Sequence, residues 1–398
     1  MKAESSVTRN GTPRTPGNGG AGQRTRLAGR SALTALVAAV LLTSACTSGG
    51  PAQPQRNPNV FMPAAQSGEV TFYLSLPGKT AALAQAAVNV SMPGSPNYRH
   101  FVSLDAAASQ FGATDAQINT AADAVKGLGL NFAADPTKLF ARVSGSTEQW
   151  MAALGAPLAQ HPAKASNPFT TYALPAQLPA ALQPPGTVVL LPVTQVYDPG
   201  IGGSPAPRTS GPTTGGVPWP LNTGTPPQTD CSAPLAPLLQ QRRVYAPQQI
   251  QTAYGIDRLR AAASGTPVIT VLDLGGGWLP GDLNLAAQCF GYTAPPIAQT
   301  QGDGVGTAMA NASSETSLDL QTAAAAAPAA RLRLVQSTAG GGGMLDAFSR
   351  ALGDPGGPPD VISLSYGGCL VAENEAAPAY LATTDSVLAM TALSGVSS

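Results

Sequence analysis

The sequence predicts two folded α/β blocks, a small α+β domain and then a parallel sheet covered by helices. Strand-like and helix-like runs alternate over residues 68–195 and again over residues 243–398. Residues 196–242 lie between them and are rich in Pro, Gly and Thr, without apolar periodicity, which is typical of a linker. Hydrophobic residues make up 43% of the 398 residues, which is enough for a core in each block.

In the first block, the apolar run that begins at Val70 ends at a Pro-Gly pair, which predicts a strand. Ser146 is a plausible N-cap for one of the helices that follow. In order, we predict a strand at 70–76, helices at 79–92, 103–111 and 115–128, a strand at 139–143, a helix at 147–154 and a last strand at 187–193.

In the second block, short apolar runs alternate with helical patterns, which indicates a parallel sheet with both faces covered. We predict a helix at 247–254, a strand at 268–273, a helix at 315–327, a strand at 332–336, a helix at 344–352 and a strand at 361–365. Chemistry in such sheets sits at the carboxyl ends of the strands. Asp273 and Tyr366 fall at two of those ends.

Residues 1–46 are predicted to be an export signal. Arginines precede the apolar run 32–42, which is shorter than the roughly 20 residues of a membrane helix. The segment ends in Leu-Thr-Ser-Ala before Cys46 and resembles a bacterial lipobox, whose cysteine carries the lipid; an ordinary signal peptide is the alternative. Residues 47–67 then form a tether. We expect an extracellular protein, or one on the outer face of the bacterial cell membrane, held there only by the signal or lipid.

Charge and histidine content exclude several classes of protein. The 21 basic and 21 acidic side chains balance, which argues against a nucleic-acid partner. The two histidines, His100 and His161, both lie in the first block, and we expect both at the surface. A subtilisin-type triad and a histidine metal site in the second block are therefore not expected. The glycine run 340–343 lacks the Lys of a phosphate loop and is expected to shape a loop near a substrate cleft.

The four cysteines are widely spaced and form no C-x-x-C pair, so neither a zinc ribbon nor a thioredoxin-like site is expected. Outside the cell, Cys231, Cys289 and Cys369 allow one disulfide and leave one thiol. A Cys231–Cys289 bond is one possible pairing. No histidine motif beside any of the three favours a cysteine protease.

The segment 313–319 carries the candidate chemistry. Glu315 and Asp319 lie four residues apart at the start of a predicted helix, so both carboxylates point to one side. Acids are also favoured in the first turn of any helix, and this ordinary interpretation stays open. In a cleft, such a pair shares a proton and acts as a general base in acid.

Several short motifs, in this order, resemble those of one peptidase family. They are Ser95–Phe101 and Gln110–Gly112 in the first block, and Tyr245–Gln249, Ala253–Gly255, Asp273–Gly277, Glu315–Asp319 with Ala327–Pro328, and Val361–Gly367 in the second. Their order is similar to that of the sedolisins, or serine-carboxyl peptidases, preceded by a pro-kumamolisin-type activation domain. The resemblance covers nearly all of both blocks. It implies a ferredoxin-like α+β prodomain at 68–195 and a subtilisin-like parallel sheet at 243–398.

The resemblance also implies residue roles. Glu315 would be the general base for a serine nucleophile, Asp319 would orient it, and Asp273 would assist a proton relay. Tyr366 stands where relatives often carry tryptophan. The implied function is a serine-type endopeptidase that cuts protein or peptide substrates at acidic pH. It would be made as a proenzyme, inhibited by its own prodomain until acid loosens the contact and the bridge near residues 200–243 is cut.

One departure from the family is as informative as the match. The family's oxyanion aspartate, in a G-D-S-G-like segment, and its G-T-S nucleophile motif follow a strand that would begin near Leu393–Ser398, and neither motif occurs in this sequence. Ser363 and Ser365 have different neighbours. The sequence therefore predicts an incomplete catalytic sheet with an open edge, no turnover, and no cofactor, since the family's calcium site also belongs to the later part. The alternative is a non-catalytic envelope lipoprotein, derived from a degenerate peptidase, that acts as a binding protein.

Overall fold

The computed structural model describes residues 57–60, 69–164, 169–197, 247–256, 258–259, 265–274, 277–301, 314–338, 342–366 and 377–398. The predicted signal, Cys46 and most of the tether and linker lie outside these residues. The chain divides into the units Met1–Pro54 and Gln55–Ser398, and all that follows concerns the second unit. In the described part of the chain, no helix is long and apolar enough to cross a membrane.

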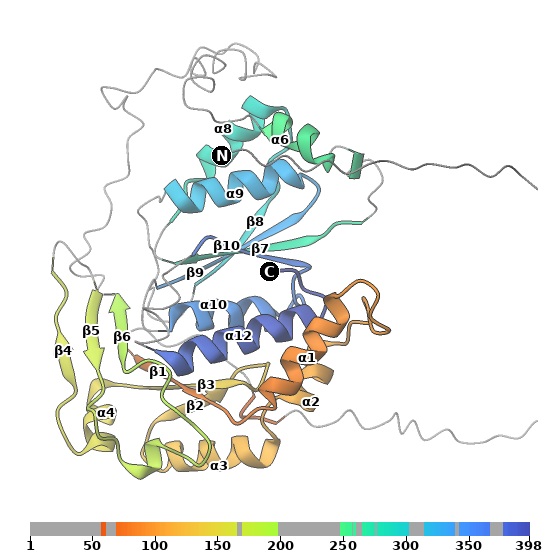
Figure 1. Ribbon diagram of the computed structural model, residues 1–398. Helices are drawn as coiled ribbons and strands as arrows, with labels where there is room; N and C mark the ends of the chain where they lie inside the picture. The colour runs from red at the N-terminus through yellow and green to blue at the C-terminus, as the bar shows by residue number, and fades with distance from the viewer. Residues whose placement is uncertain are drawn as a thin grey trace, which may run out of the picture. The chain divides into compact units, whose positions relative to one another are not determined.

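The first block is built on a three-stranded antiparallel sheet in the order β1-β3-β2 (Figure 1). Val189 adds a single antiparallel bridge to Leu74 at the other edge of β1, so the spatial order agrees with a ferredoxin-like unit. The strands are β1 (Val70–Ser75), β2 (Asn131–Ala134) and β3 (Phe140–Gly145), and the helices are α1 (Thr80–Ser91), α2 (Leu104–Phe111), α3 (Asp115–Lys126), α4 (Thr147–Leu154) and the short 3-10 helix η1 (Ala180–Leu182).

Side-chain caps set where the helices of this block begin. Ser103 caps α2 by accepting from the backbone N–H of Ala106. Thr114 and Ser146 head full capping boxes, in which the side chain three residues on bonds back to the cap. The predicted helices at 103–111, 115–128 and 147–154 are therefore confirmed to within two residues.

The predicted strand at 187–193 is wrong in its extent. Pro192 has no N–H to give to a sheet, and it divides this extended segment in two. Before the proline, Val188 and Leu190 bond to the backbone of β1. After it, β6 (Val193–Tyr197) pairs with β5 (Phe169–Ala173), which pairs in turn with β4 (Ala159–His161) in a second antiparallel sheet. The sequence did not predict β2, β4 or β5.

Both faces of the β1-β3-β2 sheet are buried. Successive side chains alternate between the faces, so Phe72 points to one side and Tyr73 to the other. On the Phe72 side, α3 and α4 supply the cover, and Trp150 packs edge-on against Phe72 with ring centroids 5.0 Å apart. The Trp150 indole N–H donates to the carbonyl of Val70 at 2.9 Å. The Tyr73 side is covered by helices of the second block.

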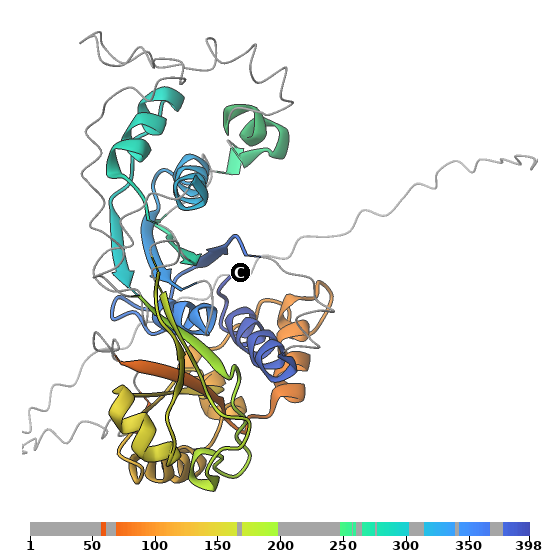
Figure 2. The same cartoon turned by 90° about the vertical axis from the view of Figure 1, so that its left-hand side faces the viewer.

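The second block holds a four-stranded, fully parallel sheet in the order β10-β7-β9-β8, which confirms the predicted parallel sheet. Figures 1 and 2 place α8 and α9 on one face and α10 on the other. The strands are β7 (Val268–Leu274), β8 (Ile297–Gln301), β9 (Arg331–Ser337) and β10 (Val361–Leu364). The helices are α6 (Pro247–Tyr254), α8 (Pro280–Phe290), α9 (Ser314–Ala326), α10 (Gly343–Leu352) and α12 (Pro378–Leu393). The sequence did not predict α8, β8 or α12.

After α12 the chain turns back to the outer edge of β10. Ser397 forms a parallel bridge with Val361, and the Ile362 N–H donates to the Ser397 carbonyl at 2.7 Å. In return, the Ser397 N–H donates to the Asp360 carbonyl at 3.0 Å. The resemblance expects a further strand of the sheet at this position.

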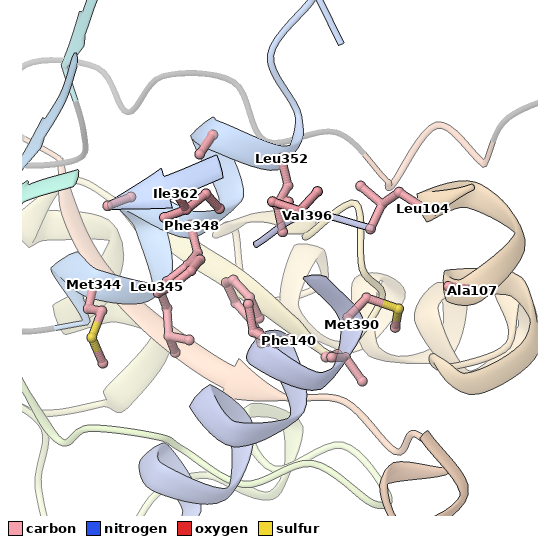
Figure 3. Close-up of a cluster of buried hydrophobic side chains, with 14 of the residues drawn as sticks. Leu104, Ala107, Phe140, Met344, Leu345, Phe348, Leu352, Ile362, Met390 and Val396 are labelled. Atoms are coloured by element: carbon pink, nitrogen blue, oxygen red, sulfur yellow. The ribbon is translucent and has the colours of Figure 1, made fainter. Parts of the chain in front are cut away.

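A single apolar cluster joins the two blocks (Figure 3). Phe140 of β3 lies between Leu345 of α10 and Met390 of α12, and all three side chains are fully buried. Helix α12 also packs along α1 and α2, as Figure 2 shows. At its end, the Leu393 carbonyl accepts a hydrogen bond from the Val102 N–H at 3.2 Å. The two blocks are therefore docked through α10 and α12.

Gly342, which directly precedes α10, supports this docking. Its φ of 88° is left-handed, and a Cβ at this position would clash with the ring of Tyr73 in the first block. Gly357 has the same φ of 88° but open space around it. We predict that Gly342→Ala lowers the free energy of unfolding by about 2–4 kcal/mol, because backbone strain and overpacking add, whereas Gly357→Ala costs about 1–2 kcal/mol.

Urea unfolding of the two variants, followed by tryptophan fluorescence, measures the difference. Gly357→Ala is the matched control, since it carries the same backbone strain without the clash. Equal losses in the two variants would show that Tyr73 does not pack on Gly342.

Candidate functional site

The two acids of the predicted helix lie on one turn of α9. The helix begins at Ser314, so Glu315 stands in its first turn, and Asp319 follows one turn later. Glu315 is exposed and Asp319 is half-buried. The charge of Glu315 contributes to a raised pKa of Asp319, as expected for a like-charged pair on one side of a helix. The structure therefore brings Glu315 and Asp319 together as the sequence predicts.

Ser365 ties this helix to the sheet. Its Oγ donates a hydrogen bond to Asp319 Oδ1 at 2.8 Å. Ser365 directly follows β10, so the bond joins α9, on one face of the sheet, to the carboxyl end of a strand. Sequence reasoning assigned no role to this serine. The available signal was its place at the carboxyl end of the predicted strand 361–365, where functional groups of parallel sheets gather.

The pKa of Asp319 is raised above its ordinary value. Burial is the main cause, and the charge of Glu315 adds to it, while the hydrogen bond from Ser365 acts in the opposite direction. Because this pKa is higher in the folded chain than in the unfolded chain, ionised Asp319 lowers the stability above its folded pKa. The cost disappears as the pH falls below the unfolded value.

Asp273 lies buried near the carboxyl end of β7, with 7% of its surface exposed. In the register of the sheet it pairs with Gln336 of β9. On its other side the pairing of β7 with β10 ends at Leu272 and Leu364, so Asp273 and Ser365 both stand one residue further along. Asp273 thus shares the edge of the sheet that Asp319 reaches through Ser365. Its place at a strand end is as predicted, and its role in a relay stays a prediction.

Tyr366 follows Ser365 and is 48% exposed. Among the described residues it makes no hydrogen bond to Glu315, Asp319 or Asp273, so the structure does not join it to the acids.

A row of hydrogen-bonded neutral side chains, which the sequence did not predict, lies further along the same edge of the sheet. The Trp278 indole N–H donates to Gln299 Oε1 at 3.1 Å, and the Gln299 amide donates to Gln336.

The remaining candidates behave as ordinary surface or structural residues. His100 and His161 are both exposed, as predicted. In the described part of the chain, no group of three or more His, Cys, Asp or Glu side chains is arranged to hold a metal ion. Cys289 on α8 is buried and disulfide-bonded. Cys231 and Cys369, the two partners considered from the sequence, lie outside the described residues.

Comparison with protein families finds one match, which covers residues 61–195: the family described as "Pro-kumamolisin, activation domain". It ends where the first block was predicted to end and begins within the predicted tether. The match supports a sedolisin-family propeptide, and such a domain implies an intramolecular inhibitory role in a peptidase zymogen. A search of curated proteins found no match.

The hydrogen bond to Asp319 can be tested by carboxyl NMR titration of the intact chain. We predict that Ser365→Ala raises the pKa of Asp319 further, because burial and Glu315 then act without the donor. Glu315→Gln should lower it, since the repelling charge is gone. Ser363→Ala, on the same strand two residues earlier, is the control and should leave it unchanged. An Asp319 that titrates identically with and without Ser365 would mean that the hydrogen bond does not form in solution.

Proposed function

We propose that this chain belongs to a secreted serine-carboxyl endopeptidase of the sedolisin type, made as a proenzyme and acting on protein or peptide substrates in acid. The observation that carries the proposal is the activation-domain match over residues 61–195. This block is docked on the helices of a parallel sheet, and the carboxyl edge of that sheet gathers acids. An activation domain needs an enzyme to inhibit, and the second block is the partner that it contacts.

In the proposed mechanism, Glu315 is the general base that removes the proton from a serine hydroxyl as its oxygen attacks the peptide carbonyl. The C–N bond then breaks, the proton passes to the leaving amine, and an acyl-enzyme remains. Glu315 next takes a proton from the water that attacks this ester, and that proton returns to the serine oxygen as the acid leaves. Asp319 orients Glu315, and its raised pKa suits it to hold a proton beside that base. The pair then carries one negative charge instead of two. A carboxylate base operates in acid, where histidine is protonated.

The other parts of the proposal follow the resemblance. Asp273, buried at the same edge, would extend the proton relay. The parallel sheet would be of the subtilisin-like kind, with residues 196–242 as the linker that is cut on activation. Residues 1–46 would direct export, with Cys46 as the lipid attachment site, to the outside of the cell or the outer face of its membrane.

The nucleophile is not among the serines of the described site. Ser365 is near the acids, but its hydroxyl donates to Asp319, the orienting acid, and not to the base. The sequence also lacks the G-D-S-G-like segment whose aspartate would stabilise the oxyanion. We therefore propose that the 398-residue chain by itself does not turn over peptides.

A peptide-hydrolysis assay at about pH 3–5 tests this directly. We predict no turnover by the chain alone, because nucleophile and oxyanion donor act as a unit with the base. The account of the missing serine would be contradicted if the chain hydrolysed peptides and Glu315→Gln abolished this activity. The matched control is Asp282→Asn, in the first turn of α8, which should then retain the activity.

The gene beyond the codon for Ser398 separates the two functions. A continuation that encodes G-D-S-G and G-T-S motifs supports the peptidase, and a chain extended by it should hydrolyse peptides in acid and lose this activity in Glu315→Gln. A gene without such a continuation overturns the peptidase proposal in favour of the non-catalytic binding lipoprotein.

A further inference from the structure

A fully buried carboxyl group lies at the contact between the two blocks. Asp135 follows β2 in the first block and has no exposed surface. Its Oδ1 accepts from the N–H of Thr137 at 2.8 Å and from the Thr137 hydroxyl. Its backbone is fixed by bonds to Phe140 and Lys138. Its Oδ2 is buried and completes no hydrogen bond of normal geometry with a described residue, and such burial of a polar atom is unfavourable.

Across the contact, Asp135 faces α10 of the second block. The Ser349 hydroxyl lies next to its carboxyl group, and Ser349 Oγ likewise completes no hydrogen bond of normal geometry with a described residue. The charge of Asp346, also fully buried, acts on Asp135 from the preceding turn of α10. Arg350 already bonds both oxygens of Asp346, at 3.0 and 3.1 Å, and Ser337 donates to one of them. Asp135 therefore lies near a second carboxylate, that of Asp346, and the Arg350 side chain is already hydrogen-bonded to that second carboxylate.

The other charged groups around the contact are these. Lys138, in the same turn as Asp135, extends to Asp115 and bonds it at 2.8 Å. Arg333 pairs with Asp354 past the end of α10, where Gly353 lies against Pro136. Arg142 is buried on β3, two residues from Phe140 and hence on the face that packs against the second block.

We propose that Asp135 is a proton-linked latch: docking of the first block against α10 binds a proton on this carboxyl group, so acid tightens the contact. A protonated Asp135 is neutral beside Asp346 and can donate its Oδ2–H to Ser349 Oγ, which joins the blocks. An ionised Asp135 would bury a second negative charge in the same place. Separation of the blocks returns the carboxyl group to water, where ionisation is favourable.

The direction of the pH dependence follows from linkage. Burial raises the pKa of Asp135 from 3.8 to about 6, against the opposing effect of the hydrogen-bonding groups of Ser349 and Thr137, and the charge of Asp346 adds a smaller increase. Above pH 6 the docked state bears the full cost of the ionised group. The cost decreases as the pH falls through the window between these two values, and below it no further gain follows. As the pH falls through this window, the equilibrium constant for docking of the two blocks should increase on the order of 100-fold.

This latch opposes the simplest scheme for the proposed zymogen, in which acid by itself loosens the activation domain. Only this regulatory meaning rests on the proposed function; the proton linkage belongs to the contact and holds without it. Through Asp135, acidification holds the inhibitory block in place until the linker is cut or other groups outweigh the latch.

Hydrogen exchange of the intact chain tests the proposal without an activity assay. The amides of α10 residues whose side chains lie in the shared cluster, such as Phe348 and Leu352, report opening of the contact after correction for intrinsic exchange. In the wild type we expect their protection to rise by tens of fold from pH 7.5 to 4.5. Asp135→Asn should be at least as protected as the wild type at pH 7.5 and should show little change with pH. Asp115→Asn, in the same block but in an exposed ion pair, should keep the wild-type response.

Carboxyl NMR of the wild type gives a second readout if Asp135→Asn does not fold. A buried Asp signal that titrates near pH 6 supports the latch. An Asp135 that titrates at or below pH 4, or a pH response that survives in Asp135→Asn, would overturn it. A failed assay for peptidase activity would leave both measurements unaffected.

Discussion

The contact of one sheet face with two helices organises the described fold. Tyr73 and Phe140 project from the antiparallel sheet toward α10 and α12 and share one buried cluster with Phe348 and Met390. Each of these four side chains is at most 2% exposed. Burial of side chains of this size is worth about 1.5–3 kcal/mol each. The same face also buries the polar side chains of Thr71 and Arg142.

The docking helices and the candidate site depend on the same strands. Helix α10 runs from β9 to β10, and the residue after β10 is Ser365, which holds Asp319 at 2.8 Å. The acids on α9 lie on the opposite face of the sheet from the docked block (Figures 1 and 2). The fold therefore separates two buried or half-buried carboxyl systems. Asp319 serves the candidate site, while Asp135 serves the contact between blocks, and burial raises the pKa of both.

Local signals predicted much of this arrangement. Ser146 and its capping box set the start of α4, and apolar runs bounded by turns predicted β1 and β7. Helix α12 was missed because it is apolar around most of its circumference, packed between α1 and the rest of the core, and so shows no single apolar stripe. Strands β4 and β5 were missed because the exposed side chains of β4 and the half-buried side chains of β5 show no alternation between a buried and an exposed face.

The site residues divide in the same way. Glu315 and Asp319 could be predicted, because four residues on a helix fix a common side. Ser365 and Asp135 could not, because their partners are 46 residues away or in the other block, and only tertiary packing brings them together.

A double-mutant cycle between Phe140→Leu and Phe348→Leu tests the central claim, that the two blocks form one cooperative core. Both side chains are buried in the same cluster, one from each block. The free energies of unfolding of the two single variants and the double variant give the coupling between them. The account predicts a coupling of about 1 kcal/mol. Phe72→Leu, on the opposite face of the same sheet, should add to Phe348→Leu without coupling. Strict additivity of Phe140→Leu and Phe348→Leu would contradict a docked activation domain.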